Sequence, residues 1–161
     1  MKKTNLSDYD ASSVPNGAMF HVGIVVAEWN PDITNALCEG AYDTLLAHGV
    51  LEQNIHVMHV PGSFELPSGA NLMLKHNPQI DAVICIGCVI QGETRHFDFI
   101  CEAVANGITN LSLKTDKPVI FSVLTTNSFE QAQARSGGKH GNKGVEEAIT
   151  ALKMAQNAKN C

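Results

Sequence analysis

Apolar, β-branched runs alternate with helix-like segments four times along this chain, and this alternation limits the fold more than any other feature. The strand-like runs cover residues 20–27, 55–60, 80–86 and 118–124. Helical spacing covers residues 33–48, 65–75, 99–113, 129–135 and 145–158. Strands separated by helices pair in parallel, and those buried on both faces are apolar throughout. The sequence therefore predicts an α/β fold of three layers, with a four-stranded parallel sheet flanked by helices.

The length of 161 residues allows one substantial core, so we expect residues 19–161 to form a single domain. Residues 1–18 are polar and rich in turn-forming types, which predicts an arm outside that core. The net charge of −5 leaves no basic surface for nucleic acid. No stretch approaches the about 18 apolar residues of a membrane span. We therefore expect a cytoplasmic protein with neither a nucleic-acid partner nor a membrane.

The five cysteines do not form the pattern of a disulfide framework or a metal site. Cys85 and Cys88 are three apart on a predicted strand, where such residues point to opposite faces of the sheet. The same reasoning removes His56 and His59 as a chelating pair. We expect reduced core thiols and no metal.

Residues 87–99 form a predicted strand-to-helix turn with the features of an anion site. Gly92 permits a tight backbone, Thr94 is placed to cap the helix, and the free N–H groups of a first helical turn attract phosphate. His96 lies beside them, where the helix dipole disfavours an imidazolium ion and favours a neutral imidazole that can relay protons. The alternative is a surface histidine that follows a glycine turn.

Three unusual loops follow the first three strands, at the edge of the sheet where ligands bind in this architecture. They cover residues 28–30, 61–65 and 91–96. Trp29 offers a flat ring for stacking on a heterocycle, or it fills a core or an interface. Ser63 and Glu65 face the same edge, or they only cap a helix and complement its dipole.

Six ordered motifs together resemble the lumazine synthase family over residues 20–154. They are Trp29-Asn30, VPGSFELP at 60–67, GCVIQGETRH at 87–96, PVIFSVLTT at 118–126, QAQAR at 131–135 and GNKG at 141–144. The resemblance implies a flavodoxin-like fold and an enzyme of riboflavin biosynthesis that needs no cofactor. It implies condensation of 5-amino-6-ribitylaminouracil with 3,4-dihydroxy-2-butanone 4-phosphate to 6,7-dimethyl-8-ribityllumazine, phosphate and water.

The resemblance also implies homopentamers, which in some relatives close into 60-subunit shells, with each active site shared between two subunits. It assigns proton transfer to His96. It assigns binding of the pyrimidine and its ribityl chain to Trp29, Asn30, Ser63, Phe64, Glu65, Cys88, Val89 and Ile90, with Phe121 reaching in from the neighbour. It assigns phosphate binding to Gly92, Glu93, Thr94, Arg135 and Lys143.

Four positions depart from the commonest family pattern. Trp29 replaces a phenylalanine, Gln91 a basic residue and Ala134 a glutamate, and Glu93 adds a negative charge to the phosphate loop. Two alternatives to the enzyme stay open at this point. One is a flavin or lumazine carrier without turnover, and the other is a shell protein whose role is assembly.

Overall fold

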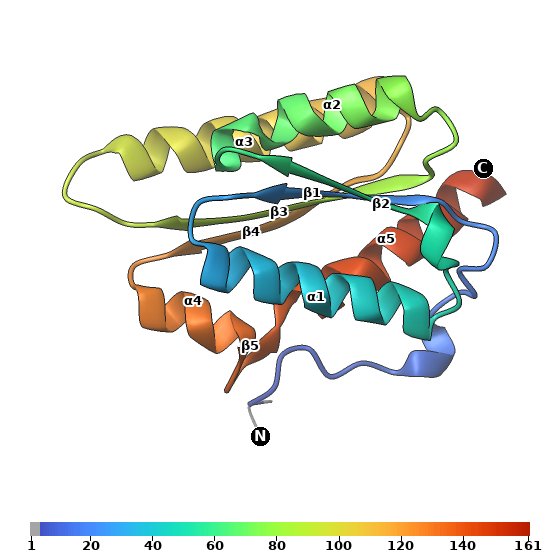
Figure 1. The fold of residues 1–161 in the computed structure, drawn as a ribbon, viewed down its shortest axis with the longest axis horizontal. Helices are drawn as coiled ribbons and strands as arrows, with labels where there is room; N and C mark the ends of the chain where they lie inside the picture. The colour runs from blue at the N-terminus through green and yellow to red at the C-terminus, as the bar shows by residue number, and fades with distance from the viewer. Residues whose placement is uncertain (1–3) are drawn as a thin grey trace.

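The computed structural model describes residues 4–161 and contains a four-stranded parallel sheet between two layers of helices (Figure 1). The strand order is β2-β1-β3-β4. The strands are β1 (Val22–Ala27), β2 (Ile55–Val60), β3 (Ala82–Ile90) and β4 (Val119–Thr126). The helices are α1 (Pro31–Ala47), α2 (Leu66–His76), α3 (His96–Thr115), α4 (Phe129–Arg135) and α5 (Lys143–Asn160). The predicted fold class is therefore confirmed.

Shorter elements connect these strands and helices. They are the 3-10 turns η1 (Ala11–Ser13), η2 (Glu52–Asn54) and η3 (Ser63–Glu65), and the strands β5 (Ser136–Gly138) and β6 (Gly141–Asn142). Strands β5 and β6 form a small antiparallel hairpin where the sequence predicted only a break between two helices. Figure 1 shows α2 and α3 on one face of the sheet and α1, α4 and α5 on the other.

Alternate side chains of the central strands pack into two separate hydrophobic cores, one on each face of the sheet. In β1, Ile24 and Val26 pack with α1 and α5, whereas Val25 and Ala27 pack with α2 and α3. Both faces of β1 and β3 are buried, which explains why these strands are apolar at almost every position. Burial on both sides holds the sheet rigidly beneath the loops at its carboxyl edge.

Strand β3 extends further than the sequence predicted. The expected strand ended at residue 86, but pairing with β4 continues as far as Ile90, which lies opposite Thr126. Pairing with β1 stops earlier, at Ile86. Residues 87–90 are therefore strand and not turn. Helix α3 begins at His96, which confirms the histidine in its first turn and extends the helix three residues before the apolar run expected from Phe99.

Helices α4, α1 and α3 begin with three different kinds of N-cap. The Ser128 side chain caps the start of α4 by accepting a hydrogen bond from the Gln131 N–H. Asn30 is the N-cap of α1, but its backbone is left-handed at φ 59° and its side chain makes no capping bond. Arg95 and not Thr94 is the N-cap of α3, because the Arg95 carbonyl accepts the first helical hydrogen bond, from the Phe99 N–H. The Thr94 hydroxyl accepts only from the His96 N–H, at 3.4 Å.

Residues 4–18 of the predicted arm lie against their own chain, and residues 1–3 lie outside the described part. The Leu6 N–H donates to the His140 carbonyl, and the Gly17 N–H donates to the His48 carbonyl. Val14 packs against the core on the α1 and α5 side. The arm thus follows the outer surface of α1, α5 and the β5–β6 hairpin.

The cysteines are free thiols, and Cys85 and Cys88 point to opposite faces of the sheet as expected. Within residues 4–161, no cluster of three or more His, Cys, Asp or Glu side chains is placed to hold a metal ion. In the same range, every helix is too short or too polar to cross a membrane.

Candidate active site

A pocket of about 560 Å³ opens at the carboxyl edge of the sheet, where the loops after β1 and β2 meet the end of β3 and the start of α3. Eleven residues line it: Trp29, Asn30, Gly62, Ser63, Phe64, Glu65, Cys88, Val89, Ile90, His96 and Ile100. The pocket thus brings together His96 and all the residues predicted to bind the pyrimidine and its ribityl chain, except Phe121. Parallel strands end at one edge, which is why loops so distant in sequence converge here.

The overhanging end of β3 exposes backbone groups to this pocket. Beyond Ile86 no β1 residue pairs with β3, and the side chain of Asn30 takes over by donating from Nδ2 to the Cys88 carbonyl at 3.0 Å. The Gln91 N–H instead donates to Thr126 on the β4 side. Because successive strand residues direct their amides to alternate sides, Cys88 and Ile90 face the pocket. Their backbone N–H and C=O groups are therefore donors and acceptors directed to the pocket side of β3.

Trp29 lies over the turn that follows β2 and is 73% exposed. A Cβ atom built on Gly62 would meet the indole Cδ1 at 3.1 Å, so the ring rests on a glycine that leaves room for it. The Glu65 carboxylate accepts a hydrogen bond from the Gly62 N–H at 3.0 Å and fixes the turn from the other side. Trp29 therefore does not fill the core of its own chain. Glu65 does stabilise the start of its helix, which was the alternative to a role at the edge of the sheet.

Ser63 is the first residue of η3 and is buried against Gly87 of β3. A Cβ atom on Gly87 would collide with its hydroxyl, so the serine occupies the space that this glycine leaves. The Ser63 side chain makes no capping bond to η3 or α2, which makes the helix-cap interpretation wrong. Phe64 beside it is largely exposed and forms an apolar wall.

His96 is the first residue of α3, and its exposed imidazole has no hydrogen-bond partner among residues 4–161. The ring is therefore available to a ligand. Cys88, also in the pocket, is buried, and burial raises the pKa of its thiol to about 11. Desolvation disfavours the thiolate, so Cys88 stays a neutral thiol at neutral pH.

Six predicted site residues lie outside the pocket of their own chain: Phe121, Gly92, Glu93, Thr94, Arg135 and Lys143. Phe121 is in the middle of the edge strand β4, opposite Cys85, and is half-buried. Residues 92–94 form an exposed loop next to the pocket, and a Cβ on Gly92 would meet nothing within 4 Å.

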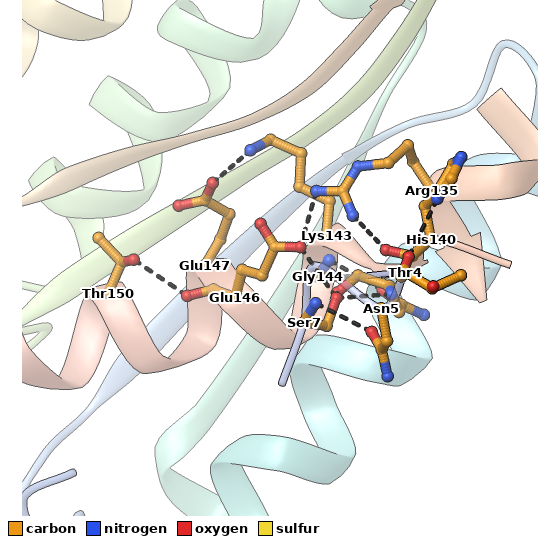
Figure 2. Close-up of polar contacts among 11 residues, drawn as sticks. Thr4, Asn5, Ser7, Arg135, His140, Lys143, Gly144, Glu146, Glu147 and Thr150 are labelled. Carbon is orange, nitrogen blue, oxygen red and sulfur yellow. Dashed lines mark hydrogen bonds and ion pairs between the residues drawn. The ribbon is translucent and has the colours of Figure 1, made fainter. Parts of the chain in front are cut away.

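Arg135 and Lys143 belong to a second cluster, formed where α4, the β5–β6 hairpin and α5 meet (Figure 2). Arg135 ends α4 and contacts Glu146 at 2.7 Å through Nη2, while its Nη1 donates to the His140 carbonyl. Lys143 begins α5 and contacts Glu147 at 2.7 Å. We call this set the hinge cluster: Arg135, His140, Lys143, Glu146 and Glu147.

The sequence reasoning missed three residues that shape these sites. Gly62 supports Trp29, and Ile100 lines the pocket one helical turn after His96, on the same face of α3. Glu146 holds Arg135. The i, i+4 relation to His96 was a usable signal for Ile100, whereas the partner of Arg135 depends on how α4 and α5 fold together.

The comparisons with known proteins agree with this geometry. The sequence model of the 6,7-dimethyl-8-ribityllumazine synthase family matches residues 19–159. The chain belongs to this family. A lumazine synthase of Cytophaga hutchinsonii is 61% identical over 150 residues, which cover 93% of each chain. The enzyme of Porphyromonas gingivalis is 58% identical over 94% of this chain and 93% of its own.

A third relative, the 6,7-dimethyl-8-ribityllumazine synthase of Christiangramia forsetii, is 55% identical over 94% of this chain and 90% of its own. The resemblance stated from six motifs is therefore confirmed. Membership of the lumazine synthase family makes the chain an enzyme, a transferase of riboflavin biosynthesis. The carrier and shell-protein alternatives are not needed to explain its pocket.

Proposed function

We propose that the pocket binds 5-amino-6-ribitylaminouracil and condenses it with 3,4-dihydroxy-2-butanone 4-phosphate. Trp29 stacks on the pyrimidine, and the amides of Cys88 and Ile90 read its polar edge. Ser63, Phe64 and Glu65 hold the ribityl chain. A flat ring on one side and fixed backbone dipoles on the other suit a planar, polar heterocycle.

In this proposal His96 relays protons between the two substrates. The uracil amine attacks the ketone and loses water to form an imine, and phosphate then leaves. The second nitrogen attacks the remaining carbonyl and loses a second water to close the ring. Every one of these steps moves a proton, and an imidazole gains and loses protons readily near neutral pH. Holding both substrates in one pocket supplies much of the remaining rate.

The observation that carries the proposal is that the predicted phosphate-binding side chains of Arg135 and Lys143 lie outside the pocket of their own chain. Among the described residues that line the pocket there is neither lysine nor arginine, although one substrate carries a phosphate. Arg135 and Lys143 are in the hinge cluster instead. We therefore infer that a neighbouring subunit presents Arg135 and Lys143 to this pocket, and that residues 92–94 bind the same phosphate through their N–H groups.

This arrangement requires an oligomer, and we infer a homopentamer that works in the cytoplasm. Phe99 and Leu113 project from α3 and are 69% and 75% exposed, which is the kind of apolar surface that subunit contacts cover. A ring in which each subunit contributes to the next pocket uses head-to-tail contacts. We infer closure of such pentamers into a shell of 60 subunits, because the short, Gly-rich connection at residues 136–141 resembles that of shell-forming relatives.

Mixed assemblies test the shared site. Chains carrying Arg135→Ala are co-expressed with chains carrying His96→Ala, and formation of 6,7-dimethyl-8-ribityllumazine is followed by absorbance. Each parent assembly has no complete site. In randomly mixed rings about a quarter of the pockets pair an intact His96 with an intact Arg135, so activity returns to about that fraction. Mixed rings as inactive as their parents would contradict a shared site.

A further inference from the structure

We propose that Ser7, in the N-terminal arm, is a positioning residue that holds Arg135 ready for the phosphate-bearing substrate. This inference rests on the proposed phosphate role of Arg135. Ser7 lies 128 residues before Arg135 in the sequence, yet both meet at the hinge cluster (Figure 2). No motif of the family resemblance includes the arm.

The contact that carries the inference is a shared carboxylate oxygen. Glu146 Oε1 accepts from Arg135 Nη2 at 2.7 Å and from the Ser7 hydroxyl at 2.9 Å. Ser7 Oγ also lies 2.9 Å from the Asn142 carbonyl and accepts from the Asn142 N–H at 2.8 Å. A hydroxyl has one proton, and the charged carboxylate is the stronger acceptor. Ser7 therefore fixes Glu146 relative to the backbone at the start of α5.

The backbone of the arm fixes the second contact of Arg135. The His140 carbonyl accepts from Arg135 Nη1 at 2.7 Å and from the Leu6 N–H at 3.0 Å. The His140 ring Nδ1 lies 3.0 Å from the Thr4 carbonyl. Both acceptors that hold the guanidinium are thus themselves held by residues 4–7.

The fit between the arm and the hairpin is tight. Gly141 has φ +89°, and a Cβ built there would collide with the Asn5 and Ser7 side chains. The arm can take this position only because residue 141 has no side chain. Ser7 itself is half-buried at this point, although its neighbours in the arm are exposed.

The consequence for Arg135 is preorganisation. An arginine side chain has many rotamers, and ordering it at the moment of binding weakens the affinity. Here two of its five N–H groups are held by Glu146 and His140, and the other three have no partner among residues 4–161. A guanidinium held at one side presents its free donors as a fork for a phosphate. Without the Ser7 hydroxyl, the Glu146 carboxylate loses one of its two hydrogen bonds within residues 4–161 and moves more freely. The Arg135 guanidinium that it holds then becomes less ordered as well.

The experiment compares arm variants of the full chain by steady-state kinetics with each substrate varied in turn. For Ser7→Ala we expect KM for 3,4-dihydroxy-2-butanone 4-phosphate to rise about 5- to 20-fold. This lies at or below the lower end of the effect of one hydrogen bond to a charged group, because Ser7 acts on Arg135 only through Glu146. KM for the uracil substrate and the assembly mass by light scattering stay unchanged. Ser7→Thr keeps the hydroxyl and restores KM. The matched control is Ser12→Ala, because the Ser12 hydroxyl contacts only Asp10.

Two results overturn the inference. One is an unchanged KM for the phosphate substrate in Ser7→Ala while Arg135→Ala raises it, which leaves the proposed function standing. The other is an equal change for both substrates, or a loss of assembly, because that is the result of a merely structural role. If Arg135→Ala leaves KM for the phosphate substrate unchanged, a different conclusion follows. Arg135 then does not bind the phosphate, and the proposed function fails at that point.

Discussion

Replacing Gly87 by alanine tests whether the pocket depends on the fit between β3 and the turn that follows β2. The added methyl group would collide with the Ser63 hydroxyl and approach Leu66 Cδ1 to 3.0 Å. Leu66 is fully buried in the core on the α2 and α3 side and cannot yield. Either the Ser63 side chain rotates or the turn at residues 62–65 moves away from β3, and Trp29 moves with the turn because its ring rests on Gly62.

Opposing contributions set the magnitude for Gly87→Ala. Overpacking a close contact typically lowers the stability of the folded state by about 1–3 kcal/mol. Alanine also restricts the backbone of the unfolded chain more than glycine does, which offsets about 0.4–1 kcal/mol of this loss. We expect a net destabilisation of about 1–2 kcal/mol. For a domain of this size, that lowers Tm by about 2–8 °C. Displacement of Ser63 and Trp29 should also raise KM for the uracil substrate about tenfold, equivalent to 1.4 kcal/mol.

Thermal melting and steady-state kinetics check this prediction against two further variants. Gly92→Ala adds the same methyl group where nothing lies within 4 Å, so its Tm should stay close to the wild-type value. Ser63→Ala in the Gly87→Ala background removes the colliding hydroxyl and should recover part of the lost stability. If Gly87→Ala has the same Tm and KM as the wild-type protein, the reasoning is refuted. The pocket would then accommodate a methyl group at residue 87 without any displacement of Ser63.

Three other predictions follow from the site and the core. His96→Ala should lower kcat about 10²- to 10⁴-fold with little change in either KM, and turnover that is unaffected would remove His96 from the mechanism. Burial raises the pKa of Cys85 to about 12, so above pH 9 the unfolded chain loses a proton that the folded chain keeps, and stability falls as pH rises. The stability advantage of wild type over Cys85→Ala, from denaturant titration, should shrink by about 1.4 kcal/mol between pH 7 and pH 10, and a constant difference would contradict the burial argument. At pH 8 iodoacetamide should label the exposed Cys161 long before Cys88, whose pKa is raised to about 11, as peptide mass spectrometry can check.

Local patterns in the sequence were enough to predict the framework of the fold. The period of the apolar residues distinguishes strands from helices, and their alternation leaves a parallel sheet as the natural arrangement. The same patterns placed three loops at one edge, so Trp29, Ser63 and His96 were expected to converge there. They do line one pocket. These inferences succeeded because each depends on neighbouring residues and on one general rule of sheet topology.

What the sequence by itself determined about this protein is therefore the α/β framework, the family and the edge where the site forms. Tertiary structure decided where β3 ends, since only the hydrogen bonds to β4 carry the strand on to Ile90. It also decided that Asn30 bonds to Cys88, and that Arg135 meets Glu146 and, through it, Ser7. These pairings join residues far apart along the chain. No local propensity encodes them, because they exist only after the layers have packed.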